Sequence, residues 1–177
     1  MESAEIIEFW FEEIEPKMHW VKDTNFDQLI KERFFKIHKA ASLGELYLWR
    51  KSPLGRLAEI IVLDQFSRNM FRDTEFAFHF DPLALVLAQE AVAIGADKEL
   101  NTKYKHFLYM PYMHSESQEI HKEALRLFSQ PGLDPEFEIK HKNIIDRFGR
   151  YPHRNKLLNR TSTAEEIEFL KGPNSSF

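Results

Sequence analysis

Apolar residues recur along the chain at the three- and four-residue spacing of amphipathic helices. The clearest stretch runs from Asp23 to Gly44, where Phe26, Ile30 and Phe34 fall on one helical face. No segment shows the alternating pattern of a β-strand bounded by hairpin turns. The pattern therefore predicts an all-α chain.

Helix-start and helix-stop signals divide this pattern into elements. Ser52-Pro53, Asp81-Pro82 and Asp134-Pro135 each place a capping side chain before a proline that favours the first helical turn. Thr163 and Glu166 form a capping box, and Pro111 is expected to end a helix near Tyr109. We expect about seven or eight helices, packed as helical hairpins in one compact domain over residues 1–177. Their expected ranges are 3–11, 24–44, 53–64, 83–94, 104–109, 115–128, 135–148 and 163–170.

Composition narrows the class of protein. The 177 residues include 16 Phe and no Cys, so an aromatic core is expected and disulfides or thiolate metal sites are excluded. The net charge of -4 comes from interleaved signs, which gives no support for nucleic-acid binding. The acidic start after Met1 is unlike a secretory signal, and the apolar stretch from Leu83 is interrupted by Gln89 and Glu90. We expect a cytoplasmic protein that contacts no membrane.

Several common catalytic signatures are missing. The six glycines are far apart, which excludes a glycine-rich phosphate loop, and the chain holds neither a Gly-x-Ser-x-Gly turn nor a His-Glu-x-x-His zinc motif. Glu138 and His141 are spaced to share a helical face, but a di-iron bundle needs two such pairs. We therefore expect no metal and no cofactor, with Glu138 and His141 as a surface pair. His38 and His121 are likewise expected at the surface or half-buried.

Two arginine-rich segments carry the most informative chemistry. Residues 63–72 read Leu-Asp-Gln-Phe-Ser-Arg-Asn-Met-Phe-Arg, and residues 147–155 read Arg-Phe-Gly-Arg-Tyr-Pro-His-Arg-Asn. A guanidinium offers a planar fork of donors suited to carboxylate or phosphate. Either these arginines converge on a pocket for an anionic ligand, or Asp64, Asp146, Glu116 and backbone carbonyls hold them in a buried structural network.

A third segment, residues 110–116, places His114 and Glu116 beside a helix start. A histidine and a carboxylate can exchange protons near neutral pH, so the pair is a candidate acid and base. It is also consistent with a hydrogen-bonded helix start. Whether the protein is an enzyme stays open, and no catalytic residue is assigned.

These segments resemble the signature of the bacterial family of unknown function numbered 924 among domains of unknown function. The matching blocks are 63–72, 81–84, 110–116, 147–155 and 160–166, and the resemblance extends over nearly the whole chain. It implies an all-α fold of helical hairpins similar to the tetratricopeptide-like superfamily, and it supplies no activity, cofactor or partner. This chain has Leu158-Asn159-Arg160 where Leu-Gly-Arg is expected, and Asn159 tolerates the left-handed conformation that glycine would adopt.

Two functional hypotheses follow. In the first, an anionic small molecule binds a pocket formed by Arg68, Asn69, Arg72, His114, Glu116, Arg147, Arg150, His153, Arg154 and Asn155. In the second, the chain is a tetratricopeptide-like scaffold for a peptide or protein, and the arginines are internal braces. The scaffold hypothesis rests on analogy of fold, and the chain lacks a regular 34-residue repeat.

Overall fold

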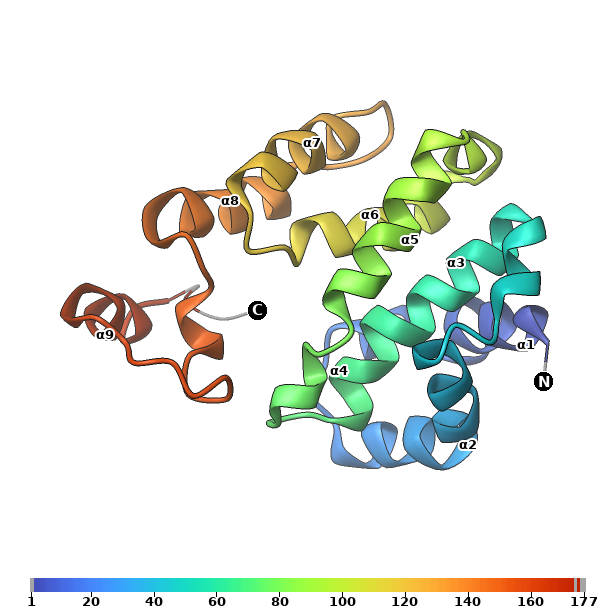
Figure 1. Ribbon diagram of the computed structural model, residues 1–177, viewed down its shortest axis with the longest axis horizontal. Coiled ribbons are helices and arrows are strands. Elements are labelled where there is room, and N and C mark those ends of the chain that lie inside the picture. Colours follow the sequence, from blue (N-terminus) through green and yellow to red (C-terminus); the bar gives the residue numbers. More distant parts are fainter. Residues whose placement is uncertain (1, 174, 176–177) are drawn as a thin grey trace. The chain divides into compact units, whose positions relative to one another are not determined.

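Every regular element of the computed structural model, which describes residues 2–173 and 175, is a helix. The all-α prediction is therefore confirmed (Figure 1). The α-helices are α1 (Ser3–Glu8), α2 (Thr24–Ser42), α3 (Pro53–Ile61), α4 (Ser67–Met70), α5 (Asp81–Ala93), α6 (Thr102–Met113), α7 (Gln118–Phe128), α8 (Glu136–Phe148) and α9 (Ala164–Leu170). Two π-helical turns, η1 (Phe9–Glu13) and η4 (Val62–Phe66), extend α1 and α3. The 3-10 turns are η2 (Pro16–His19), η3 (Tyr47–Lys51), η5 (Glu75–Ala77), η6 (Ala96–Glu99) and η7 (Pro152–Arg154).

The chain groups into two compact units, and the boundary between them follows Pro111 within α6. Unit 1 comprises the residues up to Pro111, and unit 2 begins at Tyr112. The expectation of one domain over residues 1–177 and of a tetratricopeptide-like arrangement stays a prediction.

Two of the four predicted helix caps form, those of Ser52 and Thr163; Asp134 does not cap α8, whose cap position is occupied by Pro135. The Ser52 hydroxyl accepts a hydrogen bond from the Gly55 amide at 3.1 Å, and Thr163 forms a capping box with Glu166. Elsewhere the expected cap was wrong by a few residues. Glu2 precedes α1 in place of Ser3, and Ser117 caps α7 where the sequence suggested a start at 115.

The Asp81-Pro82 signal correctly predicts where a helix starts, but Asp81 does not cap that helix. Phe80 occupies the cap position of α5, and Asp81 is its first helical residue. The Asp81 carboxylate instead binds the guanidinium of Arg68. A strong charged partner thus replaces the local backbone as the target of this side chain.

The predicted helix break at Pro111 does not occur. Helix α6 continues through this proline to Met113. Proline lacks one amide donor and crowds the preceding turn, which is costly in a long helix interior. Here it stands in the last turn, and the surrounding residues Leu108, Tyr109 and Tyr112 are all buried. Burial of this aromatic stretch outweighs the loss of a single hydrogen bond.

In unit 1, α1 packs on α3, α2 packs on α4, and α3 packs on α5. Figure 1 shows α3 continuing into α4 with α5 alongside. The core between these helices contains the rings of Phe9, Phe34 and Phe66, which meet in tilted and edge-to-face arrangements with centroids 4.7–6.0 Å apart. The predicted aromatic core is therefore present in this unit.

In unit 2, α7 packs on α8, and α9 packs on η7. Ile144, Ile145 and Tyr151 are buried together, and Phe148 packs against Phe169 at 5.0 Å between ring centroids. The turn near the end has the backbone geometry expected from sequence: Asn159 adopts a left-handed conformation with φ of 54°. An asparagine tolerates this conformation, as the Leu158-Asn159-Arg160 departure predicted.

Two buried histidines make the fold sensitive to acid. Burial lowers the pKa of His38 to about 4, and that of His141 to about 3. Both rings therefore stay neutral in the folded protein at a pH where the unfolded chain, with an ordinary pKa of 6.5, takes up protons. Stability is complete above this value and falls as the pH drops below it.

We expect the free energy of unfolding to decrease below pH 6.5 by roughly 1.4 kcal/mol per pH unit for each histidine. Urea unfolding of wild type and of His38→Gln, measured between pH 7 and pH 4.5, tests this. Glutamine keeps an N–H for the Ser67 hydroxyl, which the His38 ring approaches at 2.8 Å. The variant should lose stability less steeply with acid, and equal slopes for the two proteins would contradict the assignment.

Candidate functional site

The first arginine motif lies in unit 1 and is bound by carboxylates. Arg68 contacts both oxygens of Asp81 at 2.9 and 3.0 Å and one oxygen of Asp64 at 3.1 Å. The π-helical turn η4 places Asp64 and Gln65 in the core, where both are buried. The Arg68 guanidinium therefore binds two carboxylates within unit 1. Of these, only Asp64 was predicted from the sequence.

Arg72 and Asn69 share a single partner, Asp27 in the first turn of α2. The amide of Asn69 donates to one oxygen of Asp27 at 2.8 Å, and Arg72 binds both oxygens of the same carboxylate. This arrangement ties α2 to α4. Sequence reasoning missed Asp27, because its distance along the chain from the motif gives no sign of contact.

In unit 2, Arg150 forms a bidentate pair with Glu166. Its Nε and Nη2 lie 2.6 and 2.8 Å from the two oxygens of Glu166, whose side chain is only 2% exposed. The amides of Thr163 and Asn155 donate to the same carboxylate. The hydrogen bond from Arg150 is the main reason that the pKa of Glu166 falls to about 2.

Arg147 makes a much weaker contact three residues earlier. It binds Glu165 at 2.8 Å, but the two side chains are 52% and 62% exposed. The guanidinium also lies over the Phe148 ring at 4.7 Å. Asp146, which we expected to pair with the arginines, binds Lys142 instead.

Glu116 is held by an arginine outside the predicted set. Arg160 binds both of its oxygens at 2.6 and 2.9 Å, and the backbone amide of Tyr151 donates to it at 2.7 Å. Burial raises the pKa of Glu116, but the hydrogen bonds from Arg160 and Tyr151 outweigh it and leave the pKa below its ordinary value. Glu116 is therefore an ionised acceptor in this unit. His114, with which Glu116 was a candidate acid–base pair, is half-buried.

The remaining predicted residues, His153, Arg154 and Asn155, lie in η7 or directly after it. Arg154 is buried and lies 4.7 Å above the Tyr151 ring, and the His153 ring centroid is 5.6 Å away. Asn155 is buried and donates to Ser162 at 3.0 Å as well as to Glu166. Seven of the ten predicted ligand-binding residues thus belong to unit 2 and three to unit 1. That they form one ligand pocket stays a prediction.

The Glu138 and His141 pair is not at the surface, so that expectation was wrong. Glu138 is fully buried and binds the equally buried His121, whose Nδ1 is 2.7 Å from Oε1 of the carboxylate. Burial raises the pKa of Glu138. His38 and His141 are also buried, because packing between helices fixed their positions rather than local polarity. Within residues 2–173 and 175 no three His, Asp or Glu side chains gather as a metal site.

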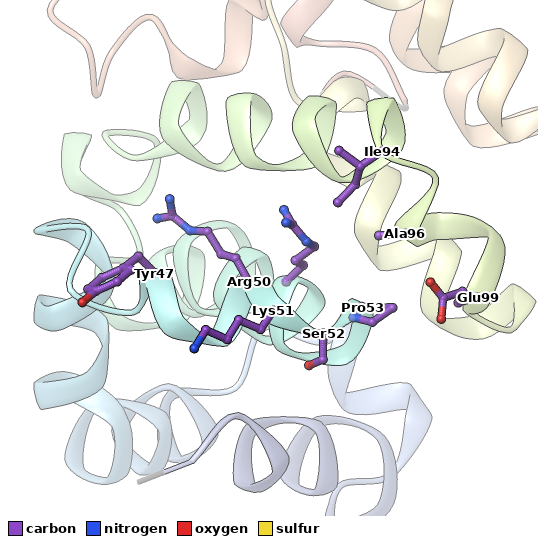
Figure 2. A pocket seen from close by; sticks show the side chains of 9 residues that line it. Tyr47, Arg50, Lys51, Ser52, Pro53, Ile94, Ala96 and Glu99 are labelled. Carbon is purple, nitrogen blue, oxygen red and sulfur yellow. The ribbon is translucent and has the colours of Figure 1, made fainter.

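A cleft in unit 1 was not foreseen from the sequence. It has a volume of about 460 Å³ and lies between η3 with the start of α3 on one side and the end of α5 with η6 on the other (Figure 2). Its lining consists of Tyr47, Arg50, Lys51, Ser52, Pro53, Arg56, Ile94, Ala96 and Glu99. The volume is in the range of small-molecule sites, which is about 300–1,000 Å³.

Two arginines of this cleft are anchored by carboxylates and keep donors to spare. Arg50 gives its Nε and Nη2 to Glu59, at 2.7 Å each, and Glu59 is 1% exposed. Arg56 binds Glu90 through Nη1 alone. A guanidinium has five N–H donors, so each arginine retains donors that no acceptor among residues 2–173 and 175 occupies.

Gly55 sets the distance between the two parts of the cleft wall. A Cβ atom at this position would lie 2.0 Å from the carbonyl oxygen of Trp49 and 2.8 Å from its carbon. Only glycine allows η3, with Tyr47, Arg50 and Lys51, to pack this closely on the first turn of α3.

Comparison with known proteins places the chain in a family. The family model described as "Bacterial protein of unknown function (DUF924)" matches residues 6–174, which is almost the whole length. The chain belongs to this family. The resemblance inferred from the motif blocks is thereby confirmed, and the family as described carries no assigned function.

A solved structure agrees with the DUF924 assignment. It is a protein of unknown function from Agrobacterium tumefaciens, 38% identical, with a TM-score of 0.90 over 96% of this chain and 97% of the other. No curated protein matches the chain. For this DUF924 protein, a functional hypothesis must therefore be built from the geometry of its own residues.

Proposed function

We propose that this protein binds a small anionic molecule, and that the binding site is the cleft of unit 1 rather than the arginine-rich motifs. One observation carries the proposal: Arg50 and Arg56 are each fixed by a glutamate and still offer N–H donors to a cleft of about 460 Å³. Lys51 adds a third cation to the lining.

The arginines of the two motifs support this choice by their pairing. Three of these arginines bind a carboxylate of their own unit bidentately, with two nitrogen atoms on its two oxygens: Arg68, Arg72 and Arg150. Arg50 and Arg56 are also paired with glutamates, so what distinguishes them is that both line the cleft, together with Lys51, which has no ion-pair partner among the described residues. The scaffold hypothesis also treats these arginines as internal braces. That hypothesis stays a prediction.

Cytoplasmic location and the absence of nucleic-acid and membrane partners stay predictions as well. One stretch, Glu75–Ala93, has the length and apolar composition of a candidate membrane span, but a turn between η5 and α5 interrupts it. Core helices of soluble proteins pass the same test, so this finding carries no membrane proposal.

The proposal predicts that small anions stabilise the protein at this cleft. Acetate, butanoate and phosphate should raise the melting temperature relative to chloride at matched ionic strength, because binding to the folded state alone stabilises it. The gain is about 2.7 kcal/mol when the ligand exceeds its Kd a hundredfold. That corresponds to roughly 5 °C or more for a chain of this size.

Three variants locate the effect. Arg56→Gln should reduce the anion shift with little loss of stability, because its partner Glu90 is 49% exposed and remains hydrated. Arg147→Gln, in unit 2, should leave the shift unchanged, and Lys36→Gln serves as a control for an exposed cation of unit 1 outside the cleft. A shift lost in Arg147→Gln but kept in Arg56→Gln would return the site to the arginine motifs and overturn the proposal.

A further inference from the structure

Some of the charged side chains that line the cleft have an ion-pair partner, and others have none. Arg50 and Arg56 are matched by Glu59 and Glu90. Lys51 and Glu99 have no ion pair with any of the residues that the structure describes, 2–173 and 175. The lining therefore presents one unmatched cation and one unmatched anion.

These two charges stand at different ends of the cleft. Figure 2 shows Tyr47, Arg50 and Lys51 on η3, with the Arg50 side chain reaching toward α5 and the Lys51 side chain pointing away from it. Glu99, on η6, lies at the opposite end of the view beside Ala96. The lining between the two ends includes the apolar side chains of Pro53 and Ile94.

We propose that the ligand of this cleft is a zwitterion with a short apolar middle. Its carboxylate meets the spare donors of Arg50, at the end of the cleft where Lys51 adds positive charge, and its ammonium meets Glu99. This inference rests on the proposed anion-binding function and adds the identity of the ligand's second charge. A simple anion would gain from the arginines but would leave the Glu99 carboxylate at the other end of the cleft without a counter-charge. Complementary charges at both ends select the ligand that carries both.

Three six-carbon compounds separate the contributions: 6-aminohexanoate carries both charges, hexanoate lacks the ammonium, and hexylamine lacks the carboxylate. Their dissociation constants are measured by calorimetry on the full chain, together with 4-aminobutanoate and butanoate as a shorter pair. We expect the better of the two amino acids to bind about fivefold more tightly than the alkanoate of its length. This is the upper end of what a partly exposed ion pair contributes.

Variants assign the preference to Glu99. In Glu99→Gln the ratio of the two dissociation constants should fall to about one, with alkanoate binding retained. Glu75→Gln, an exposed glutamate of a 3-10 turn in the same unit, should keep the wild-type ratio. Lys51→Gln should weaken the amino acid and the alkanoate together.

The outcomes distinguish the two proposals. If hexanoate and butanoate bind as well as the amino acids, or if the preference survives in Glu99→Gln, the zwitterion inference is overturned and the anion-binding function stands. If neither amino acid nor alkanoate binds and anions give no melting shift, the proposed function fails and this inference fails with it.

Discussion

Replacing Arg150 with glutamine is expected to destabilise unit 2 by roughly 3 kcal/mol. The substitution leaves the Glu166 carboxylate, which is 2% exposed, without its guanidinium partner. A buried charge that loses its counter-charge costs about 3–5 kcal/mol, because its hydration is not restored. The lower figure applies here, since the amides of Thr163 and Asn155 still donate to Glu166. Chemical unfolding at pH 7, followed by circular dichroism and tyrosine fluorescence, measures the change.

Arg147→Gln is the matched control for this experiment. It removes an arginine from the same motif that also binds a glutamate of α9, but Glu165 is 62% exposed. Exposed ion pairs contribute about 0–1 kcal/mol, so this variant should unfold almost as wild type does. The two arginines lie three residues apart in the same motif, and the burial of their carboxylate partners is what distinguishes them. Equal losses in the two variants would show that burial of the carboxylate does not set the cost.

Acid provides a second readout of the Arg150 pair. The pKa of Glu166 is lowered in the folded protein, so its contribution to stability is present above its ordinary value of 4.5 and is lost as the pH falls toward about 2. The difference in stability between wild type and Arg150→Gln should therefore shrink over this range. This follows because protonation removes the charge that the guanidinium neutralises.

Local signals along the chain predicted most of the helix boundaries. Ser52 and Thr163 cap helices as expected, and Asn159 adopts the left-handed turn, because each of these outcomes depends on residues within a few positions. Pro111 shows the limit of such signals. Its local preference for ending a helix is weaker than the burial of Tyr109 and Tyr112 around it, and burial depends on distant parts of the fold.

Side-chain partners were predicted far less well than helices. The arginine motifs were recognised, but their partners Asp27 and Glu166 lie in other helices, many residues away along the chain. Periodicity states which face a residue occupies and leaves open which helix covers that face. For the same reason His121 and Glu138, 17 residues apart, were not expected to form a fully buried pair.

The cleft was not predicted from the sequence, for a different reason. Its residues come from two short 3-10 turns and two helix ends, and apart from the helix-start signal Ser52-Pro53 none of these shows a motif. The nearest signal was Gly55, two residues after Pro53 in a helix whose first turn would ordinarily avoid glycine. A glycine inside a helix indicates close approach of another backbone, and here that backbone is Trp49 of η3.

Gly55→Ala is expected to destabilise unit 1 by about 1–3 kcal/mol, or to displace η3. The new methyl group would lie 2.0 Å from the Trp49 carbonyl oxygen, far inside van der Waals contact, and backbone on both sides limits relief. In an open helix the same change would instead stabilise by about 0.5–1 kcal/mol. The sign of the change in unfolding free energy, measured by urea denaturation, therefore reports whether η3 is packed as described.

Binding measurements on the same variant connect this contact to the cleft. Because η3 carries Arg50 and Lys51, its displacement should weaken the binding of butanoate, even at a temperature where the variant is fully folded. Gly172→Ala provides the control, since a Cβ there would meet its nearest atom at an ordinary 3.4 Å and should change neither stability nor binding. A Gly55→Ala protein with wild-type stability would show that η3 and α3 are further apart than the structure places them. If stability fell but butanoate still bound as in wild type, the geometry of η3 would not determine the site, and the cleft would lose its claim to be the anion-binding surface.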